Sequence, residues 1–406
     1  MPSLESATVV VWIGVGSRFE QENIAGISHF IEHMSFKGSK KYKTAQEMSE
    51  TIDAMGADYN AATSREWTNF FVKSRAKNME KSFDVLSDMI LNPTLDETEI
   101  EKERGVILEE IAMQEDSPIE KIGEIFTEMI FKGNPLARDI AGSKASVRAI
   151  SQKDFIDFRY KHYKGGNIVI TVAGGIHHEE AEKLAMKYFF DVEPGEKEVP
   201  EAFVLAQKTP NLKVHYKKSE QAHFILGFMG HGRNYERRYP ENVLATILGR
   251  GMSSRLFNEI REKRGLAYTV STSISRYSDT GIFETYAGVD LKRIEEAIGV
   301  MLDQHYGINE GKFPITNAEL VKAKEYMKGR IALALEDTLS VCDYYGQRVM
   351  FMDQIETPEE IFEKIDAVTI DEIYEAANNL FKKETLNLAV IGPFKNEEKF
   401  AKIVNS

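Results

Sequence analysis

The amino-acid sequence repeats itself, because its two halves carry the same order of features. The strand-like run that begins at Asn167 matches the run that begins at Asn387, which is an offset of 220 positions. The opening run Val9–Gly16 matches Phe224–Gly230 at a similar offset. A chain that encodes one pattern twice is restricted to folds with two similar domains, and we predict a duplicated domain.

The two predicted domains are separated by a segment with the composition of a linker. Residues 191–212 combine proline, glycine and charged side chains, which is typical of an extended connection. We therefore predict domains over residues 1–200 and 210–406. Within each half, short β-branched runs alternate with long amphipathic stretches. This alternation predicts an α+β fold, in which each domain is a mostly antiparallel sheet packed with helices.

Composition narrows the class of protein. With 42% hydrophobic and 28% charged residues over 406 positions, the chain is typical of a globular protein rather than of a disordered or fibrous one. A single cysteine, Cys342, excludes an intramolecular disulfide framework and a cysteine-based zinc ribbon. The net charge of −13 disfavours nucleic acid or an anionic membrane as the main partner.

The sequence also lacks recognisable signals for export or membrane insertion. No apolar run reaches the roughly 18 residues that a membrane-spanning helix needs. The stretch Met1–Phe19 has no basic segment before its apolar part, unlike a signal peptide. We therefore expect a cytoplasmic protein.

An H-x-x-E-H motif from His29 to His33 is the strongest chemical signal in the chain. On a helix, His29 and His33 project from one face about one turn apart, so two imidazole nitrogens can bind one zinc ion. Glu32 lies beside them, where it can take a proton from a water molecule. The alternative interpretation is a chance pattern on an amphipathic helix.

A catalytic zinc site needs a third protein ligand. Glu103 and Glu110 are seven positions apart in a helical pattern and therefore share one helix face. On the residues alone, a solvated acidic face remains the more common explanation of such a pattern.

With Glu110 lying 77 positions after His33 and Glu103 seven before Glu110, the chain resembles the pitrilysin/insulinase family of zinc metallopeptidases, the inverzincins. It is most similar to the subgroup of chains of about 400 residues that includes the processing-peptidase β subunit. The resemblance implies one zinc ion (Zn²⁺) held by His29, His33 and Glu110, with Glu32 as general base. Glu103 would orient the ligands.

The internal repeat indicates that only the first half binds metal. The positions in the second half that match the two histidines fall near Ala245 and Gly249, and Glu110 matches Arg330. The second domain would then bind substrate or form a chamber wall.

The resemblance also identifies residues that would bind peptide. In the family, the segment that contains Asn60, Ala61 and Ala62 is an edge strand to which the substrate adds by main-chain hydrogen bonds. Without the resemblance, an ordinary hairpin with a polar turn explains it. Arg261 and Tyr268 match a pair that binds the substrate carbonyl. Without the resemblance, Arg261 is simply one charge on an amphipathic helix, and Tyr268 is the first part of a strand.

Partners follow from the same resemblance. Two chains would form a chamber, as a homodimer or as a heterodimer with a paralogue, in which each active site is completed in trans around a peptide substrate.

Glu120 and Glu124 match acids that contact a substrate arginine, which suggests a preference for basic residues near the cleaved bond. The alternative is an ordinary acidic surface.

Two expectations remain open at the level of sequence. Family members carry about one more strand before the run Val9–Gly16, so either the chain is shortened by that strand or its start is assigned at an internal methionine. A missing strand would expose a sheet edge. We predict a zinc endopeptidase. The alternatives are a non-catalytic structural subunit and a catalytic subunit that needs an inactive paralogue.

Overall fold

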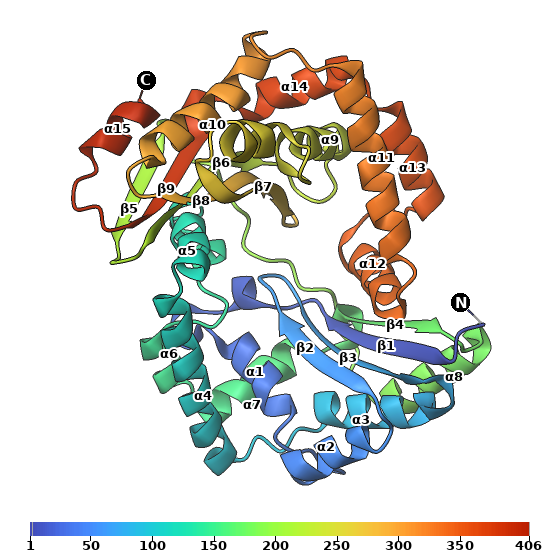
Figure 1. The fold of residues 1–406 in the computed structure, drawn as a ribbon. Coiled ribbons are helices and arrows are strands. Elements are labelled where there is room, and N and C mark those ends of the chain that lie inside the picture. Colours follow the sequence, from blue (N-terminus) through green and yellow to red (C-terminus); the bar gives the residue numbers. More distant parts are fainter. Residues whose placement is uncertain (2, 406) are drawn as a thin grey trace. The chain divides into compact units, whose positions relative to one another are not determined.

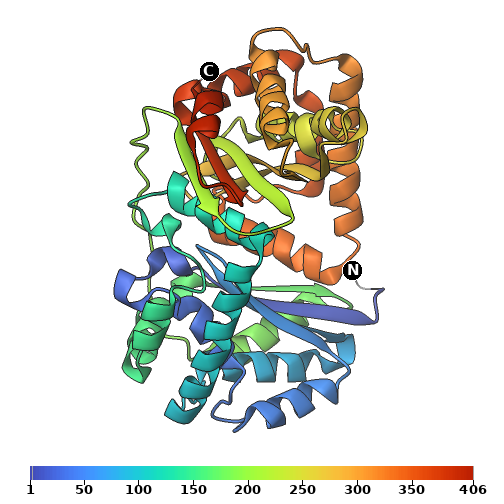
Figure 2. The ribbon, with the colours of Figure 1, turned by 60° about the vertical axis from the view of Figure 1, so that its left-hand side comes forward.

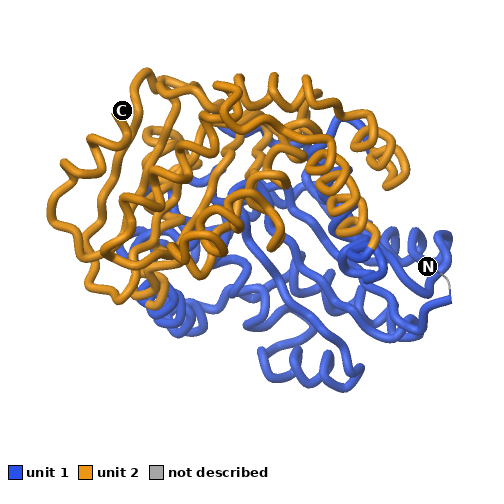
Figure 3. The backbone as a smooth tube through the Cα atoms, turned by 45° about the horizontal axis from the view of Figure 1, so that its top comes forward, with its two compact units in different colours: residues 1–112, 138–201, 333–355 blue, residues 113–137, 202–332, 356–406 orange. Residues whose placement is uncertain are grey.

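A computed structural model describes residues 1 and 3–405 of the chain (Figure 1). The chain forms two compact units, each assembled from three segments (Figure 3). Unit 1 contains residues 1–112, 138–201 and 333–355, and unit 2 contains residues 113–137, 202–332 and 356–406. None of the helices within the described residues is long and apolar enough to cross a lipid bilayer.

Unit 1 is built on a four-stranded antiparallel sheet in the order β2-β3-β1-β4. Its strands are β1 (Ser6–Ile13), β2 (Asp58–Thr63), β3 (Thr68–Arg75) and β4 (Ile168–Gly174). The central strand β1 is rich in valine, and its residues from Ala7 to Ile13 are fully buried. Such β-branched residues favour a strand that is covered on both faces. β2 and β4 form the two edges of the sheet.

Helices cover both faces of this sheet (Figures 1 and 2). Val9 and Val11 of β1 belong to a large core with α1 and α3, whereas Val10 and Trp12 pack with Cys342 of α12 on the other face. This alternation follows from the two-residue period of a strand. The helices of unit 1 are α1 (Ile27–Ser35), α2 (Ala45–Asp53), α3 (Met79–Leu91), α4 (Glu97–Asp116), α6 (Lys144–Ala149), α7 (Gln152–His162), α8 (His178–Phe189) and α12 (Thr338–Phe351).

Unit 2 is built on a five-stranded sheet in the order β5-β9-β6-β8-β7. Its strands are β5 (Asn211–Tyr216), β6 (Gln221–Gly230), β7 (Ala267–Arg276), β8 (Gly281–Asp290) and β9 (Leu386–Gly392). All pairs are antiparallel except β5 with β9, which is parallel. The helices are α5 (Pro118–Ile130), α9 (Arg238–Gly249), α10 (Ile294–Asn309), α11 (Asn317–Ala334), α13 (Pro358–Ala367), α14 (Ile370–Leu380), α15 (Glu398–Val404) and a π-helix over Phe257–Glu262.

The two sheets confirm the predicted α+β fold with two similar domains. The strand order β2-β3-β1-β4 of unit 1 recurs in unit 2 as β7-β8-β6-β9, with the same antiparallel pairing. The fifth strand of unit 2, β5, has no counterpart in the described part of unit 1.

The compact units differ from a simple division of the sequence at the linker, because each takes one helix from the other half of the chain. α5 belongs to unit 2 and packs against β9, β6 and β5, while α12 belongs to unit 1 and packs against β4 and β1. The two helices occupy equivalent positions in the repeat, 220 residues apart. The amphipathic pattern of a helix shows which face is buried, but not which sheet buries it. The exchange was therefore not visible in the sequence.

Candidate metal centre

The candidate metal centre is organised by the short helix α1. Gly26 precedes the helix in a left-handed conformation with φ of 95°, which glycine adopts without strain. The backbone N–H groups of Gly26 and Ser28 donate to the two carboxylate oxygens of Glu20 at 2.7 and 2.8 Å, which stabilises the start of the helix. Phe30 and Ile31 bury the opposite face in the core. The remaining face presents the two histidines.

The predicted metal ligands converge. Nε2 of His29 and Nε2 of His33 are 3.2 Å apart, and Oε2 of Glu110 on α4 lies 3.8 and 3.5 Å from them, respectively. In a tetrahedral site with metal–ligand bonds of about 2.0–2.1 Å, donor atoms are separated by roughly 3.3 Å. The three atoms therefore form a triangle of the size that one zinc ion requires.

The surroundings of the triangle also fit a metal. Oε2 of Glu110 is buried and has no hydrogen-bond partner among the described residues, which would be costly without a cation. Burial, followed by the charge of His33, lowers the pKa of His29 to about 4. His29 is therefore neutral near pH 7, the state in which imidazole binds metals.

The ring of His33 is oriented by Glu103. Oε1 of Glu103 lies 2.8 Å from Nδ1 of His33, and Oε2 of Glu103 lies 2.6 Å from Nζ of Lys37. Burial opposes ionisation of Glu103, but its hydrogen bonds with His33 and Lys37 lower its pKa overall. When Nδ1 of His33 carries the proton that Glu103 accepts, Nε2 is left free for the metal.

Glu32 lies one turn after His29 and beside His33, and it is held by a neighbour from the sheet. The hydroxyl of Thr63, the last residue of β2, donates to Oε2 of Glu32. Burial is the main reason that the pKa of Glu32 is raised, and the charge of Glu110 adds to it, against the opposing effects of Thr63 and His33. A carboxylate with a raised pKa is a stronger base, as expected for a residue that accepts a proton.

The segment predicted to bind peptide is an edge strand that ends at this cluster. β2 pairs only with β3 among the described strands, and α1 packs against β2. The N–H of Ala61 donates to the side-chain Oδ1 of its neighbour Asn60 at 2.9 Å. Asn60 and Ala62 are exposed. β2 therefore has an outer edge to which a further strand can be added, although Asn60 occupies the N–H of Ala61 in this structure.

Unit 2 brings Arg261 and Tyr268 together. Nη1 of Arg261 donates to the carbonyl oxygen of Tyr268 at 2.9 Å, and the guanidinium lies 4.7 Å from the centre of the tyrosine ring. Tyr268 stands on β7, the edge strand of unit 2 that corresponds to β2. Its side chain is 75% exposed, so it is free to contact a ligand.

The two acids predicted to contact a basic substrate residue lie on α5 in unit 2. Glu120 is exposed in the first turn of the helix, which begins at the cap Ser117. Glu124 forms a salt bridge of 2.7 Å with Lys121. Part of its charge is therefore already balanced within the helix.

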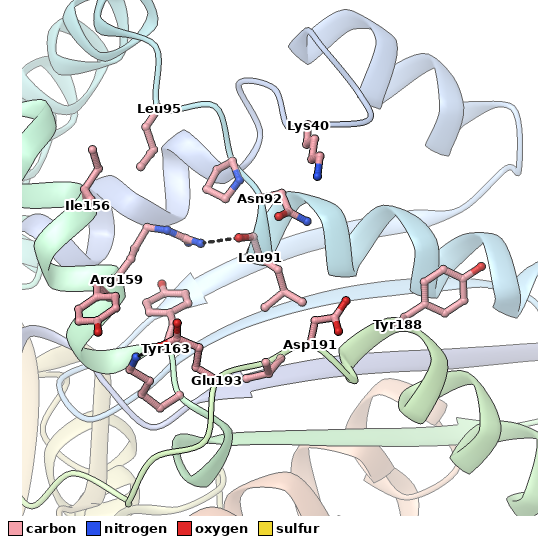
Figure 4. A pocket seen from close by; sticks show the side chains of 14 residues that line it. Lys40, Leu91, Asn92, Leu95, Ile156, Arg159, Tyr163, Tyr188, Asp191 and Glu193 are labelled. Atoms are coloured by element: carbon pink, nitrogen blue, oxygen red, sulfur yellow. Dashed lines mark hydrogen bonds and ion pairs between the residues drawn. The ribbon is translucent and has the colours of Figure 1, made fainter.

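A separate hollow of about 470 Å³ in unit 1 contains none of the predicted site residues (Figure 4). Arg159 of α7 lies at its wall, and its Nη2 donates to the carbonyl oxygens of Ile90 and Leu91 at 2.6 and 3.3 Å. These are carbonyls at the C-terminal end of α3, which have no partner within the helix. Arg159 therefore caps α3.

Sequence reasoning did not identify Thr63, Lys37 or Glu20 as parts of the centre. Lys37 is one turn after His33, so helical spacing could have suggested its contact with Glu103. The hydrogen bond between Thr63 and Glu32 depends on where β2 ends relative to α1, and no local pattern reports that position.

Comparison with known proteins places the chain in a family. Residues 1–144 match the family described as insulinase (peptidase family M16), and residues 149–327 match the peptidase M16 inactive domain. An "uncharacterized zinc protease" of Rickettsia felis is 35% identical over 97% of this chain and 94% of its own length. The "uncharacterized zinc protease YmxG" of Bacillus subtilis is also 35% identical, over 97% of this chain and 95% of its own.

Solved structures share the fold. A protease from Helicobacter pylori has a TM-score of 0.89 at 22% identity, covering 96% of this chain and 95% of its own. A chain of complex III from Candida albicans has a TM-score of 0.86 at 20% identity, covering 100% of this chain and 95% of its own. With the sequence relatives above, we conclude that this protein belongs to peptidase family M16.

Proposed function

We propose that the protein is a zinc-dependent endopeptidase that cleaves oligopeptides or extended polypeptide segments. One observation carries this proposal: His29, His33 and Glu110 converge with the spacing of a zinc site, and Glu32 is held beside them on the same helix as the histidines. The printed names of the relatives, which describe them as zinc proteases, support it.

Each residue of the metal centre has its own role in the proposed reaction. Zinc bound by His29, His33 and Glu110 would polarise the peptide carbonyl and make an adjacent water more acidic. Glu32 accepts the proton of the attacking water and passes it to the leaving amine. The hydroxyl of Thr63 binds one oxygen of Glu32 and leaves the other free for that proton.

The substrate is bound as an added strand on β2. Main-chain hydrogen bonds select an extended backbone rather than particular side chains, so a broad range of sequences would be accepted. The side chains Ala61 and Ala62 are small enough to allow close approach. Glu120 and Glu124 would favour a basic residue near the cleaved bond.

Arg261 and Tyr268 would stabilise the negative charge that develops on the carbonyl oxygen, since a guanidinium and a phenol both donate hydrogen bonds.

We place this pair in the active site of a second copy, in a homodimer whose chamber admits peptides. Mixing Glu32→Gln chains with Arg261→Ala chains tests this arrangement. Recovery of activity in isolated mixed dimers is expected, and mixed dimers without activity would contradict sites completed in trans. A protein that is active only with a paralogue would point to a heterodimer.

The proposed activity is tested by zinc analysis combined with a fluorogenic peptide library. The native chain is expected to bind one zinc ion and cleave peptides, whereas Glu32→Gln should keep zinc and lose at least about 100-fold in rate, the usual contribution of a general base. Cleavage at the native rate by Glu32→Gln would refute the mechanism. Zinc binding without cleavage by the native chain would favour a non-catalytic subunit.

A further inference from the structure

The hollow of about 470 Å³ in unit 1 combines apolar and positively charged side chains (Figure 4). Leu91, Ile156 and Val192 contribute aliphatic side chains, and Lys40 and Arg159 contribute positive charges. Aromatic rings come from Tyr160, Tyr163 and Tyr188. The volume lies within the range of about 300–1,000 Å³ in which proteins bind small organic molecules.

Arg159 carries a positive charge that no acid balances. Its Nη2 donates to the carbonyl oxygens of Ile90 and Leu91, and its Nη1 is buried without an acceptor among the described residues. No described carboxylate forms a salt bridge with its guanidinium. The ring of Tyr163, whose centre is 4.7 Å from the guanidinium carbon, offsets only part of the cost. Because a buried charge without a counter-ion is unfavourable, such groups normally bind an ion or a charged ligand.

The other charged side chains that line the hollow do not supply the missing anion. Glu193 is already paired with Lys164. Asp191 is exposed, and Figure 4 shows it apart from the guanidinium of Arg159. Lys40 is also exposed, and its side chain has no partner among the residues that the structure describes. The lining therefore has an excess of positive charge, in a chain whose net charge is −13.

Hydrogen bonds connect the walls of the hollow to one another. Nε2 of Gln152 on α7 donates to the carbonyl oxygen of Leu95 at 2.9 Å, and Arg159 of the same helix binds the end of α3. Leu95 has a left-handed φ of 47°, which is uncommon for a residue other than glycine. Such a conformation persists only where the surrounding packing enforces it, and Leu95 is buried. The hollow is therefore bounded by fixed elements.

We propose that this hollow binds a small organic carboxylate with an aromatic body. The carboxylate lies at the wall formed by Arg159, whose charge is unbalanced, and Lys40 adds a second cation. A planar carboxylate matches the planar guanidinium in shape as well as in charge. The aromatic body lies against Leu91, Ile156 and the tyrosine rings, where its burial is favourable. A neutral molecule of the same shape would leave the charge of Arg159 unbalanced.

This binding site is independent of the proposed peptidase activity. None of the residues that line the hollow belongs to the metal centre or to β2. The carboxylate is therefore a ligand of a separate site and not a peptide that is cleaved.

The proposal is tested with two ligands that have nearly the same shape but differ in charge, naphthylacetate and naphthylacetamide. Isothermal titration calorimetry on the full chain measures both affinities. Naphthylacetate should bind saturably, and naphthylacetamide should bind at least tenfold more weakly because it cannot balance the charge of Arg159. Equal affinities, or no saturable binding of naphthylacetate, would overturn the proposal.

Protein variants locate the bound carboxylate. Ile156→Trp introduces a bulky ring into the lining and should weaken binding of naphthylacetate at least tenfold. Met186→Trp is the matched control, because Met186 is an apolar helix residue of unit 1 that lies outside the hollow. Both positions are exposed, so both variants should fold. Unchanged binding by Ile156→Trp would overturn the proposal, since the ligand would then be bound elsewhere, such as at a zinc ion in the metal centre.

A second pair of variants tests the charge and leaves Arg159, which also caps α3, in place. Lys40→Gln should weaken binding of naphthylacetate several-fold and leave the affinity for naphthylacetamide unchanged. Lys77→Gln makes the same change of charge at an exposed lysine of unit 1 outside the hollow and should affect neither ligand. An equal loss in the two lysine variants would contradict a carboxylate bound in the hollow, because it would show a general effect of net charge.

Discussion

At the scale of residues, Glu103 controls which nitrogen of His33 is available to a metal. The contact between Oε1 of Glu103 and Nδ1 of His33 is 2.8 Å long, and Lys37 holds the second oxygen of the same carboxylate. Burial works against a charged imidazole at His33, but the hydrogen bond to Glu103 and the nearby acids raise its pKa overall. Glu103 therefore positions His33 and is not itself one of the three converging side chains that would hold the metal.

We predict that Glu103→Gln weakens zinc binding by about 10–100-fold, the usual effect of removing a carboxylate that orients a histidine ligand. Competition with a chelator of known affinity measures the change. Glu109→Gln is the matched control, because Glu109 is an exposed acid on the same helix. An equal loss in both variants would show a general charge effect instead of a specific contact.

A second prediction at this scale concerns a buried carboxylate in unit 2. Oε2 of Glu356 accepts hydrogen bonds from Arg238 at 2.5 Å and from Tyr239 at 2.8 Å, and Lys364 contacts the other oxygen. Burial alone would raise the pKa of Glu356, but these hydrogen bonds and the charge of Arg238 lower it to about 2. A lowered pKa in the folded state stabilises the fold only while the group is ionised.

The contribution of Glu356 to the free energy of unfolding is therefore complete at pH values above about 4.5, the pKa of this group in the unfolded chain. The contribution disappears as the pH falls towards 2. The shift corresponds to about 3 kcal/mol at neutral pH. We expect the difference in unfolding free energy between the native chain and Glu356→Gln to be larger at pH 7 than at pH 3. Urea titrations at both values measure it, and a constant difference would show that ionisation of Glu356 does not contribute.

At the scale of elements, the edge strand β2 is kept closed by its own side chain. Oδ1 of Asn60 accepts the N–H of Ala61, a group that a strand-forming substrate would need. Asn60→Ala is therefore expected to lower KM several-fold while kcat and zinc content stay constant. Ala61→Pro removes the same N–H and should raise KM, because the substrate can then no longer bond to it. The variant should still fold, because proline is tolerated where the N–H of an edge strand faces solvent.

Steady-state kinetics on one fluorogenic peptide measures both variants of β2, and zinc analysis controls for damage to the centre. If Ala61→Pro left KM unchanged, the substrate would not be bound through this edge. The opposite signs expected for the two variants separate a specific main-chain contact from general loss of structure.

The elements also show what the sequence could and could not predict. The pairing of His29 with His33 follows from helical periodicity alone, so spacing was sufficient. Glu110 comes from a different helix, and only the resemblance to a family connected it to the histidines. The contact of Thr63 with Glu32 and the capping of α3 by Arg159 depend on how elements pack, which no local pattern encodes.

At the scale of the whole molecule, the exchange of α5 and α12 makes each unit depend on both halves of the sequence. Ile122 and Phe126 of α5 are fully buried in the core of unit 2, and Cys342 of α12 is buried with Trp12 in unit 1. The packing is close: a Cβ atom added at Gly346 of α12 would lie 2.2 Å from Nε1 of Trp12. Each sheet therefore needs a helix from the other half of the sequence to bury its apolar face completely.

This dependence predicts how separated halves behave. Residues 1–200 expressed alone would lack α12 and expose the face of β1 that carries Val10 and Trp12, whereas residues 210–406 alone would lack α5. An exposed apolar sheet face promotes aggregation, so we expect each half alone to be unstable or insoluble. Co-expression should give a soluble complex, because each half supplies the helix that the other needs. In the co-expressed complex, Gly346→Ala introduces a clash with Trp12 and should weaken the association of the two halves by about 1–3 kcal/mol. Two halves that each unfold cooperatively on their own would contradict the predicted dependence.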